Sequence, residues 1–184
     1  MSQPNKETVR DYIEDLKTEF PKLKVYKEKP WWLNIIFKAP LIRRLKWFDY
    51  TQTIGMNIWF SERWDLGSPS SQMCTLRHER KHLQQFQKYT LLGMFFLYFF
   101  IFFPIGFAYF RAKFEREGYF ESIRARIEYY GSTSEVKEGC LQSYLNTFVR
   151  PNYLWAWPFK KTVLKWFEED WAAAINERKN SVLK

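Results

Sequence analysis

The chain has 184 residues, which is enough for one domain with a hydrophobic core but short for two. Its net charge is +9, and 21% of its residues are aromatic. This composition is typical of proteins that bind anionic lipid or nucleic acid, but it also fits a soluble protein with basic residues on its surface. Two cysteines, Cys74 and Cys140, exclude a disulfide framework and favour an intracellular protein, although one disulfide between them stays open.

The first 60 residues predict one helix and two strands. Residues 1–20 are charged with apolar residues at helical spacing, and they lack the apolar core of a signal peptide. Residues 23–27 alternate apolar and basic side chains, as in a short strand. Residues 31–45 indicate a short helix or an irregular hydrophobic arm. Residues 48–60, rich in β-branched and aromatic side chains, predict a longer strand.

A turn at residues 66–71 precedes a helix that should begin near Ser70 or Ser71. This helix contains the only two histidines of the chain, His78 and His82, with Glu79 directly after the first. The four-residue spacing points both imidazoles the same way, and H-E-x-x-H is the pattern in which zinc peptidases combine two metal ligands with a carboxylate. With no other histidine in the chain, chance produces this arrangement roughly once in a thousand cases. The alternative is a helix with two exposed histidines and no metal.

Residues 89–110 contain no charged side chain, and Phe is the commonest residue among them. Twenty-two such residues are long enough for a membrane span. If Glu117 on the next helix is a third ligand of the same zinc ion, a straight helix would separate it from His82 by about 50 Å, whereas two ligands of one zinc ion must each lie about 2 Å from it. We therefore expect an apolar helical hairpin over 89–110, bent near Pro104 and Gly106, with Gly93 as a further candidate. Its tip belongs either to the core or to a lipid-facing surface.

The remaining chain predicts three helices. Residues 114–130 form a charged amphipathic helix that ends at Gly131, and residues 134–148 form a helix with Ser134 as N-cap. An aromatic connector, 150–158, leads into a final helix at 159–178. No internal repeat or linker divides the chain, so residues 1–184 are interpreted as a single domain.

The site needs a third ligand, and it cannot be a histidine. Downstream of the apolar stretch, the residues Glu117-Gly118 and Glu121 resemble the gluzincin metallopeptidases, in which a glutamate on the next long helix completes the zinc site. The resemblance implies that Glu117 binds the metal and that Glu121, one turn later, orients a ligand histidine. Glu115 is expected to point elsewhere, toward solvent. The alternative for all three is a solvated face among arginines and lysines.

The resemblance covers residues 51–130. A strand at 53–60 leading into the motif helix would be the edge strand of such a fold, to which a substrate adds as a further strand. The chain departs from larger gluzincins because it has no spare histidine to stabilise an oxyanion. Tyr153, Tyr129 and Tyr130 are candidates by residue type, although structural roles suit all three. Cys74, one turn before His78, is interpreted as a packing residue rather than a ligand.

The sequence thus predicts a zincin-like α+β protein, mostly helical, with a small sheet preceding the motif helix. Its expected activity is zinc-dependent hydrolysis of peptide or protein substrates, with Zn²⁺ on His78, His82 and Glu117 and with Glu79 as general base. We expect a cytoplasmic protein, with peripheral contact to anionic membranes as an option. The main alternative is a non-catalytic metal-binding protein at a membrane surface or in an assembly; a nucleic-acid-binding module is least favoured, because the basic residues are spread along every helix.

Overall fold

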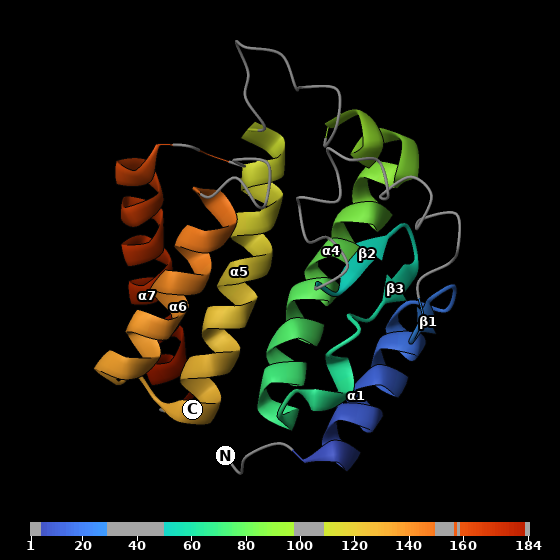
Figure 1. Cartoon of the computed structure of the whole chain (residues 1–184), viewed down its shortest axis with the longest axis horizontal. Helices are drawn as coiled ribbons and strands as arrows, with labels where there is room; N and C mark the ends of the chain where they lie inside the picture. The colour runs from blue at the N-terminus through green and yellow to red at the C-terminus, as the bar shows by residue number, and fades with distance from the viewer. Residues whose placement is uncertain (1–4, 29–49, 98–108, 150–156, 158, 183–184) are drawn as a thin grey trace.

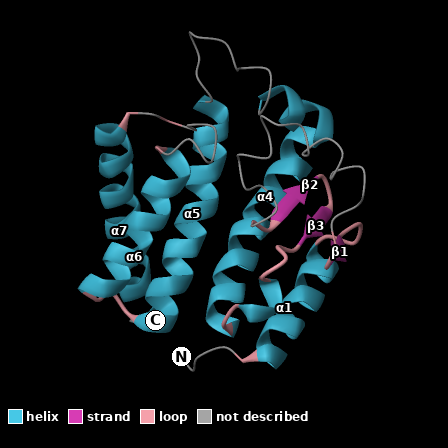
Figure 2. Ribbon diagram, in the orientation of Figure 1, coloured by secondary structure: helices cyan, strands magenta, loops and turns pink. Residues whose placement is uncertain are grey.

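The structure is a computed structural model of the chain, and it describes residues 5–28, 50–97, 109–149, 157 and 159–182. Over these residues it is mostly helical, with one small sheet preceding the motif helix, as predicted. Figures 1 and 2 show two groups of elements side by side. One contains α1 (Lys6–Glu19), the sheet and α4 (Pro69–Phe95); the other contains α5 (Tyr109–Tyr130), α6 (Ser134–Phe148) and α7 (Lys160–Val182). The interpretation of 1–184 as one domain stays a prediction.

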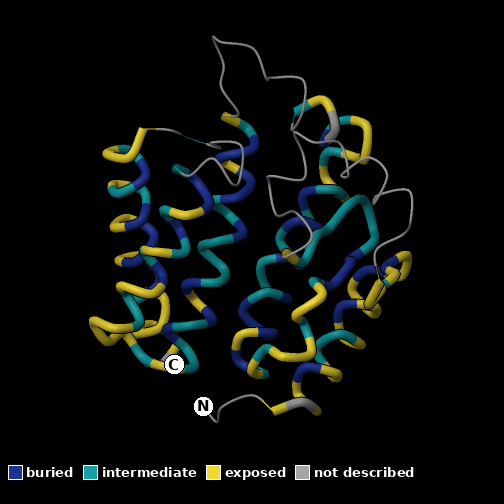
Figure 3. The backbone as a smooth tube through the Cα atoms, viewed as in Figure 1, coloured by how far each residue is buried: buried dark blue, intermediate teal, exposed yellow. Residues whose placement is uncertain are grey.

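The first helix, α1, begins at a capping box. The Asn5 side chain accepts from the backbone of Thr8, whose hydroxyl reaches back to the backbone of Asn5, so two unpaired donors are satisfied. Its apolar face buries Val9, Leu16 and Phe20 in a cluster with residues of the sheet and α4. Exposed residues of α1 and α7 face outward in Figure 3, so these helices flank the molecule on opposite sides.

The sheet has three short strands in the order β1 (Lys24–Tyr26), β3 (Asn57–Trp59) and β2 (Gln52–Ile54). β1 runs parallel to β3, and β2 runs antiparallel to it. The prediction of one strand over 48–60 was wrong, because the chain turns at Gly55, whose φ of 60° is a conformation that favours glycine. The alternative readings of 31–45 lie outside the described residues.

The motif helix α4 begins one or two residues earlier than predicted. Ser68 caps it by accepting from the backbone of Ser71, and Pro69 occupies the first helical position, where a missing N–H costs nothing. The helix is kinked at Thr90, whose φ is 61°. The Thr90 hydroxyl accepts from the backbone of Gly93 at 3.3 Å, so Thr90 acts as an N-cap for a new helical segment.

Helices α4 and α5 lie against each other and run in opposite directions. Cys74 near the start of α4 contacts Ser122, whereas Gln85, three turns later, contacts Phe114. The chain therefore reverses between the two helices. The expected tip of the hairpin, with the bends at Pro104 and Gly106, lies outside the described residues and stays a prediction. Among the described helices, none combines the length and apolar composition needed to cross a bilayer.

A second apolar cluster joins α5, α6 and α7, and it includes Tyr144, Phe148 and Phe167. Inside it, Arg116 of α5 forms a two-pronged ion pair with Asp170 of α7, which also accepts from the Tyr144 hydroxyl at 2.7 Å. This network fixes how α5 is rotated about its own axis. The N-cap of α6 is Thr133, one residue before the predicted Ser134, and Gly131 ends α5 with a φ of 83°, as its position predicted.

Candidate metal centre

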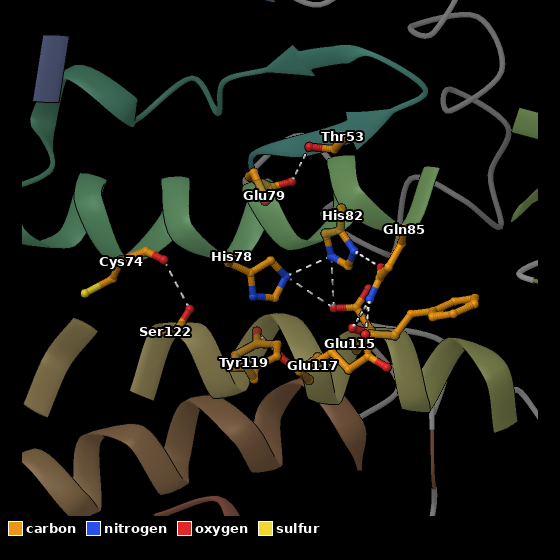
Figure 4. Close-up of polar contacts among 12 residues, drawn as sticks. Thr53, Cys74, His78, Glu79, His82, Gln85, Glu115, Glu117, Tyr119 and Ser122 are labelled. Atoms are coloured by element: carbon orange, nitrogen blue, oxygen red, sulfur yellow. Dashed lines mark hydrogen bonds and ion pairs between the residues drawn. The ribbon is translucent and has the colours of Figure 1, made fainter. Parts of the chain in front are cut away.

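His78 and His82 project from the face of α4 that is turned toward α5 (Figure 4). Their Nε2 atoms are 3.0 Å apart. Both histidine side chains are largely removed from solvent. The four-residue helical spacing thus produces a converging pair of nitrogen donors, as the sequence predicted.

The third member of the cluster is Glu115 of α5. Its Oε2 lies 3.6 Å from Nε2 of His78 and 3.9 Å from Nε2 of His82, and the residue is only 1% exposed. A point equidistant from three atoms with these separations lies about 2 Å from each of them, which is the length of Zn–N and Zn–O bonds. Two imidazole nitrogens and a buried carboxylate therefore fit a divalent cation, whose charge would offset the cost of burying Glu115.

Glu117, chosen from the sequence as the third ligand, has other partners. Its Oε2 accepts a hydrogen bond from Gln85 at 3.1 Å and lies 3.7 Å from the ammonium of Lys81. The expectation that Glu115 points to solvent was wrong. Glu115 shares a helix face with Gly118 and Tyr119, three and four residues later, and it is this face that packs against His78.

The side-chain amide of Gln85 determines which ring nitrogen of His82 donates a hydrogen bond to it. Gln85 Nε2 donates to two groups that can only accept, the carbonyl of Phe114 at 3.2 Å and the carboxylate of Glu117. Its Oε1 therefore faces Nδ1 of His82 at 2.8 Å, and Nδ1 must donate the hydrogen. In this tautomer the imidazole presents a lone pair on Nε2, the atom directed at His78 and Glu115.

The orienting role predicted for Glu121 thus falls to Gln85 in this structure. The carboxylate of Glu121 accepts hydrogen bonds from Arg124 at 2.9 and 3.2 Å. Gln85 follows His82 by three residues on α4, so their contact is a local helical pair. The spacing of His82 and Gln85 was visible in the sequence, but only carboxylates were considered there as partners of a ligand histidine, and Gln85 has an amide.

Replacing Gln85 with Leu should weaken zinc binding by roughly ten- to a hundredfold, the usual cost of losing the partner of a ligand histidine. The matched control is Gln84→Leu, because Gln84 bonds Glu19 and not the histidines. Imidazole nitrogen NMR gives a second readout, since the chain has only two histidines. The Nδ1–H signal of His82 should persist in the control and disappear in Gln85→Leu; unchanged zinc affinity and signal would remove Gln85 from this role.

The imidazole of His78 lies directly over Gly118. A Cβ built on Gly118 would meet three ring atoms of His78 at 2.8 to 3.0 Å, so no other residue type fits without displacing the ring. The Tyr119 ring packs edge-on against the same imidazole, with 4.9 Å between centroids. Gly118 is the only glycine in α5, and a lone glycine within a helical pattern signals this kind of close approach.

Gly118→Ala should therefore destabilise the protein by roughly 1–3 kcal/mol, the usual cost of overpacking, and should weaken metal binding because His78 is pushed aside. Gly139→Ala in α6 is the matched control, since its Cβ would meet nothing nearer than 3.8 Å. There the gain in helix propensity should add about 0.5–1 kcal/mol. Urea unfolding and zinc titration measure both effects, and equal behaviour of the two variants would contradict the close approach.

Glu79 is buried between α4 and the sheet, with 4% of its surface exposed. The hydroxyl of Thr53 in β2 donates to its Oε2 at 2.6 Å (Figure 4). The sequence predicted that the strand leading into the motif helix is an edge strand, but the strand that precedes α4 is β3, which lies in the middle of the described sheet. The contact with Glu79 comes instead from Thr53 of β2. The sheet thereby holds the carboxylate that follows His78 in sequence.

Described residues enclose a cleft of about 270 Å³ that is lined by His78, Glu79 and Tyr119, among others. Tyr119 packs against His78, but its hydroxyl is bonded to Thr147 and burial raises its pKa, so it stays protonated. Of the tyrosines considered from the sequence, Tyr129 contacts Arg77 and Tyr130 is exposed at the end of α5. Tyr153 lies outside the described residues.

Cys74 also borders the cleft, but it is not part of the metal cluster in the described structure. Burial raises the pKa of its thiol to about 11, so the thiol is neutral at physiological pH.

A comparison with protein families, curated proteins and solved structures found no match to this chain. The geometry of the site is therefore the basis for any assignment of function.

Proposed function

We propose that the protein is a zinc-dependent peptidase in which His78, His82 and Glu115 bind the metal and Glu79 is the general base. The proposal rests on the observation that His78 and Glu79 line the same cleft. His78 belongs to the metal cluster, and Glu79 is a buried carboxylate next to it in sequence. Zn²⁺ is proposed from the donor set of two imidazoles and one carboxylate, which other divalent ions also accept.

When bound, the ion would lower the pKa of a coordinated water toward neutrality and polarise the carbonyl to be attacked. Glu79 would accept the proton of that water at its carboxylate and pass it to the departing amine. Thr53 supports this role because its hydroxyl donates to one oxygen of Glu79, which fixes the orientation of the carboxylate.

The position of β2 supports a peptide as substrate. β2 carries Thr53 beside Glu79, so the strand lies next to the carboxylate of the motif helix. An extended peptide bound in the cleft that Glu79 borders would bring its carbonyl groups close to this carboxylate. Contacts to the peptide backbone would tolerate many side chains, so selectivity must come from the other walls of the cleft.

One observation favours the non-catalytic alternative. The ligands come from α4 and α5, which belong to the two different apolar clusters of the molecule, so a metal ion would also hold the two groups of helices together. The aromatic connector that would block the cleft in such a protein lies almost wholly outside the described residues.

Activity of the metal-loaded full chain against a broad peptide library separates the two functions. A peptidase should cleave peptides, lose this activity with a chelator and regain it with zinc. A protein that holds about one metal per chain and cleaves nothing in the library would be the non-catalytic metal-binding protein instead.

A further inference from the structure

The cleft extends well beyond the metal centre. From Glu79 and Tyr119 it continues between the first turns of α4 and the later part of α5, where Ser71, Ser122 and Arg126 line it. Its walls there are rich in hydroxyl and amide groups, which suit a polar ligand better than an apolar side chain. Among the described residues that line it, the charged side chains are Glu79, Arg63 and Arg126.

Arg126 differs from the neighbouring arginines of this region. Arg77 pairs with Glu128, Arg116 with Asp170, and Arg124 with Glu121. Arg126 is partly buried, yet no ion pair joins it to a carboxylate within the described part of the chain. A guanidinium removed from bulk water without an anionic partner is a favourable site for a ligand carboxylate.

The cysteines beside Arg126 do not neutralise it. Both Cys74 and Cys140 line the cleft, and burial raises the pKa of each thiol, although the Arg126 guanidinium opposes that shift. Both thiols are therefore uncharged at neutral pH. Glu79 is held by Thr53 at the other end of the cleft. The far end thus keeps a net positive charge.

We propose that Arg126 forms an anion-binding subsite for a carboxylate of the peptide substrate, with Arg63, which also lines the cleft, adding to the attraction. This inference rests on the proposed peptidase function. Arg126 follows Tyr119 by seven residues and Glu115 by eleven, or about 10 to 16 Å along the helix. An extended peptide covers that distance in about three to five residues, so the carboxylate lies that far from the bond to be cleaved. It belongs either to an acidic side chain or to the C-terminus of the substrate.

Binding of labelled peptides to the zinc-loaded Glu79→Gln full chain tests the subsite without hydrolysis. The probes are rhodamine-labelled peptides of about eight Ala and Ser residues, with one Glu or one Gln at each position in turn and with a free or amidated C-terminus. Fluorescence anisotropy should show that one acidic position, or the free C-terminus, strengthens binding about tenfold. Adding Arg126→Gln should abolish this preference, and Arg126→Lys should retain part of it.

Arg10→Gln is the matched control, because Arg10 is an exposed arginine on α1 and its loss changes the net charge equally. If Arg10→Gln and Arg126→Gln weaken the binding of all peptides to the same extent, the subsite is refuted. It is also refuted if the protein binds all probes equally well. A preference confined to the free C-terminus identifies the terminal carboxylate as the ligand, whereas one confined to a Glu position identifies a side chain. An intact preference in a chain whose wild type cleaves no peptide would refute the peptidase and leave the subsite standing.

Discussion

Glu115→Gln will abolish stoichiometric metal binding, whereas Glu117→Gln will leave it intact. The two variants make the same chemical change two positions apart, but only Glu115 lies with His78 and His82 in the cluster. Glu117 contacts Gln85 and Lys81 instead. Because the amide is neutral and a weak ligand, we expect the affinity for zinc to fall by at least about a hundredfold in Glu115→Gln.

Two measurements check this result. Elemental analysis of dialysed protein should give about one metal per chain for the wild type and Glu117→Gln, and almost none for Glu115→Gln. Zinc at a hundred times its Kd should stabilise the wild type and Glu117→Gln against unfolding by roughly 2.7 kcal/mol. It should not stabilise Glu115→Gln. Metal loss in Glu117→Gln alone would restore the ligand set inferred from the sequence, and retention in both would rule out a carboxylate ligand at either position.

Glu79→Gln should lower peptide hydrolysis by a factor of about a hundred to ten thousand while the metal stays bound. Gln keeps the shape of the side chain, and its amide can still bond the Thr53 hydroxyl, so the local structure is preserved. It lacks a group that accepts a proton at neutral pH. The loss should appear in kcat, with little change in KM, because the base acts in the transition state rather than in binding.

The metal content and the unfolding curve of Glu79→Gln are the controls, and both should match the wild type. Glu62→Gln is a second control, since Glu62 is an exposed glutamate that does not line the cleft. Full activity in Glu79→Gln would show that Glu79 is not the base. Loss of metal in that variant would show that its role is structural.

Several features of the fold were predictable because they depend on local chemistry. The apolar face of residues 1–20, the turn before α4 and the glycine that ends α5 are read from residue types at helical spacing. Two features that depend on the backbone conformation of a single residue were not predicted. Gly55 has a positive φ and turns the one expected strand into a hairpin, and Thr90 has a positive φ and kinks α4. The sequence contains these residues without showing which of their allowed conformations the fold selects.

The sequence by itself determined the part of the candidate site that lies on α4. His78, Glu79 and His82 are related by the geometry of one helix, so their mutual positions follow from spacing alone, and the contact of Gln85 with His82 has the same origin. Only the tertiary structure decided which glutamate completes the cluster. Glu115 and Glu117 differ by 200° around α5, and the face that meets His78 depends on how α5 packs against α4, α6 and α7 together.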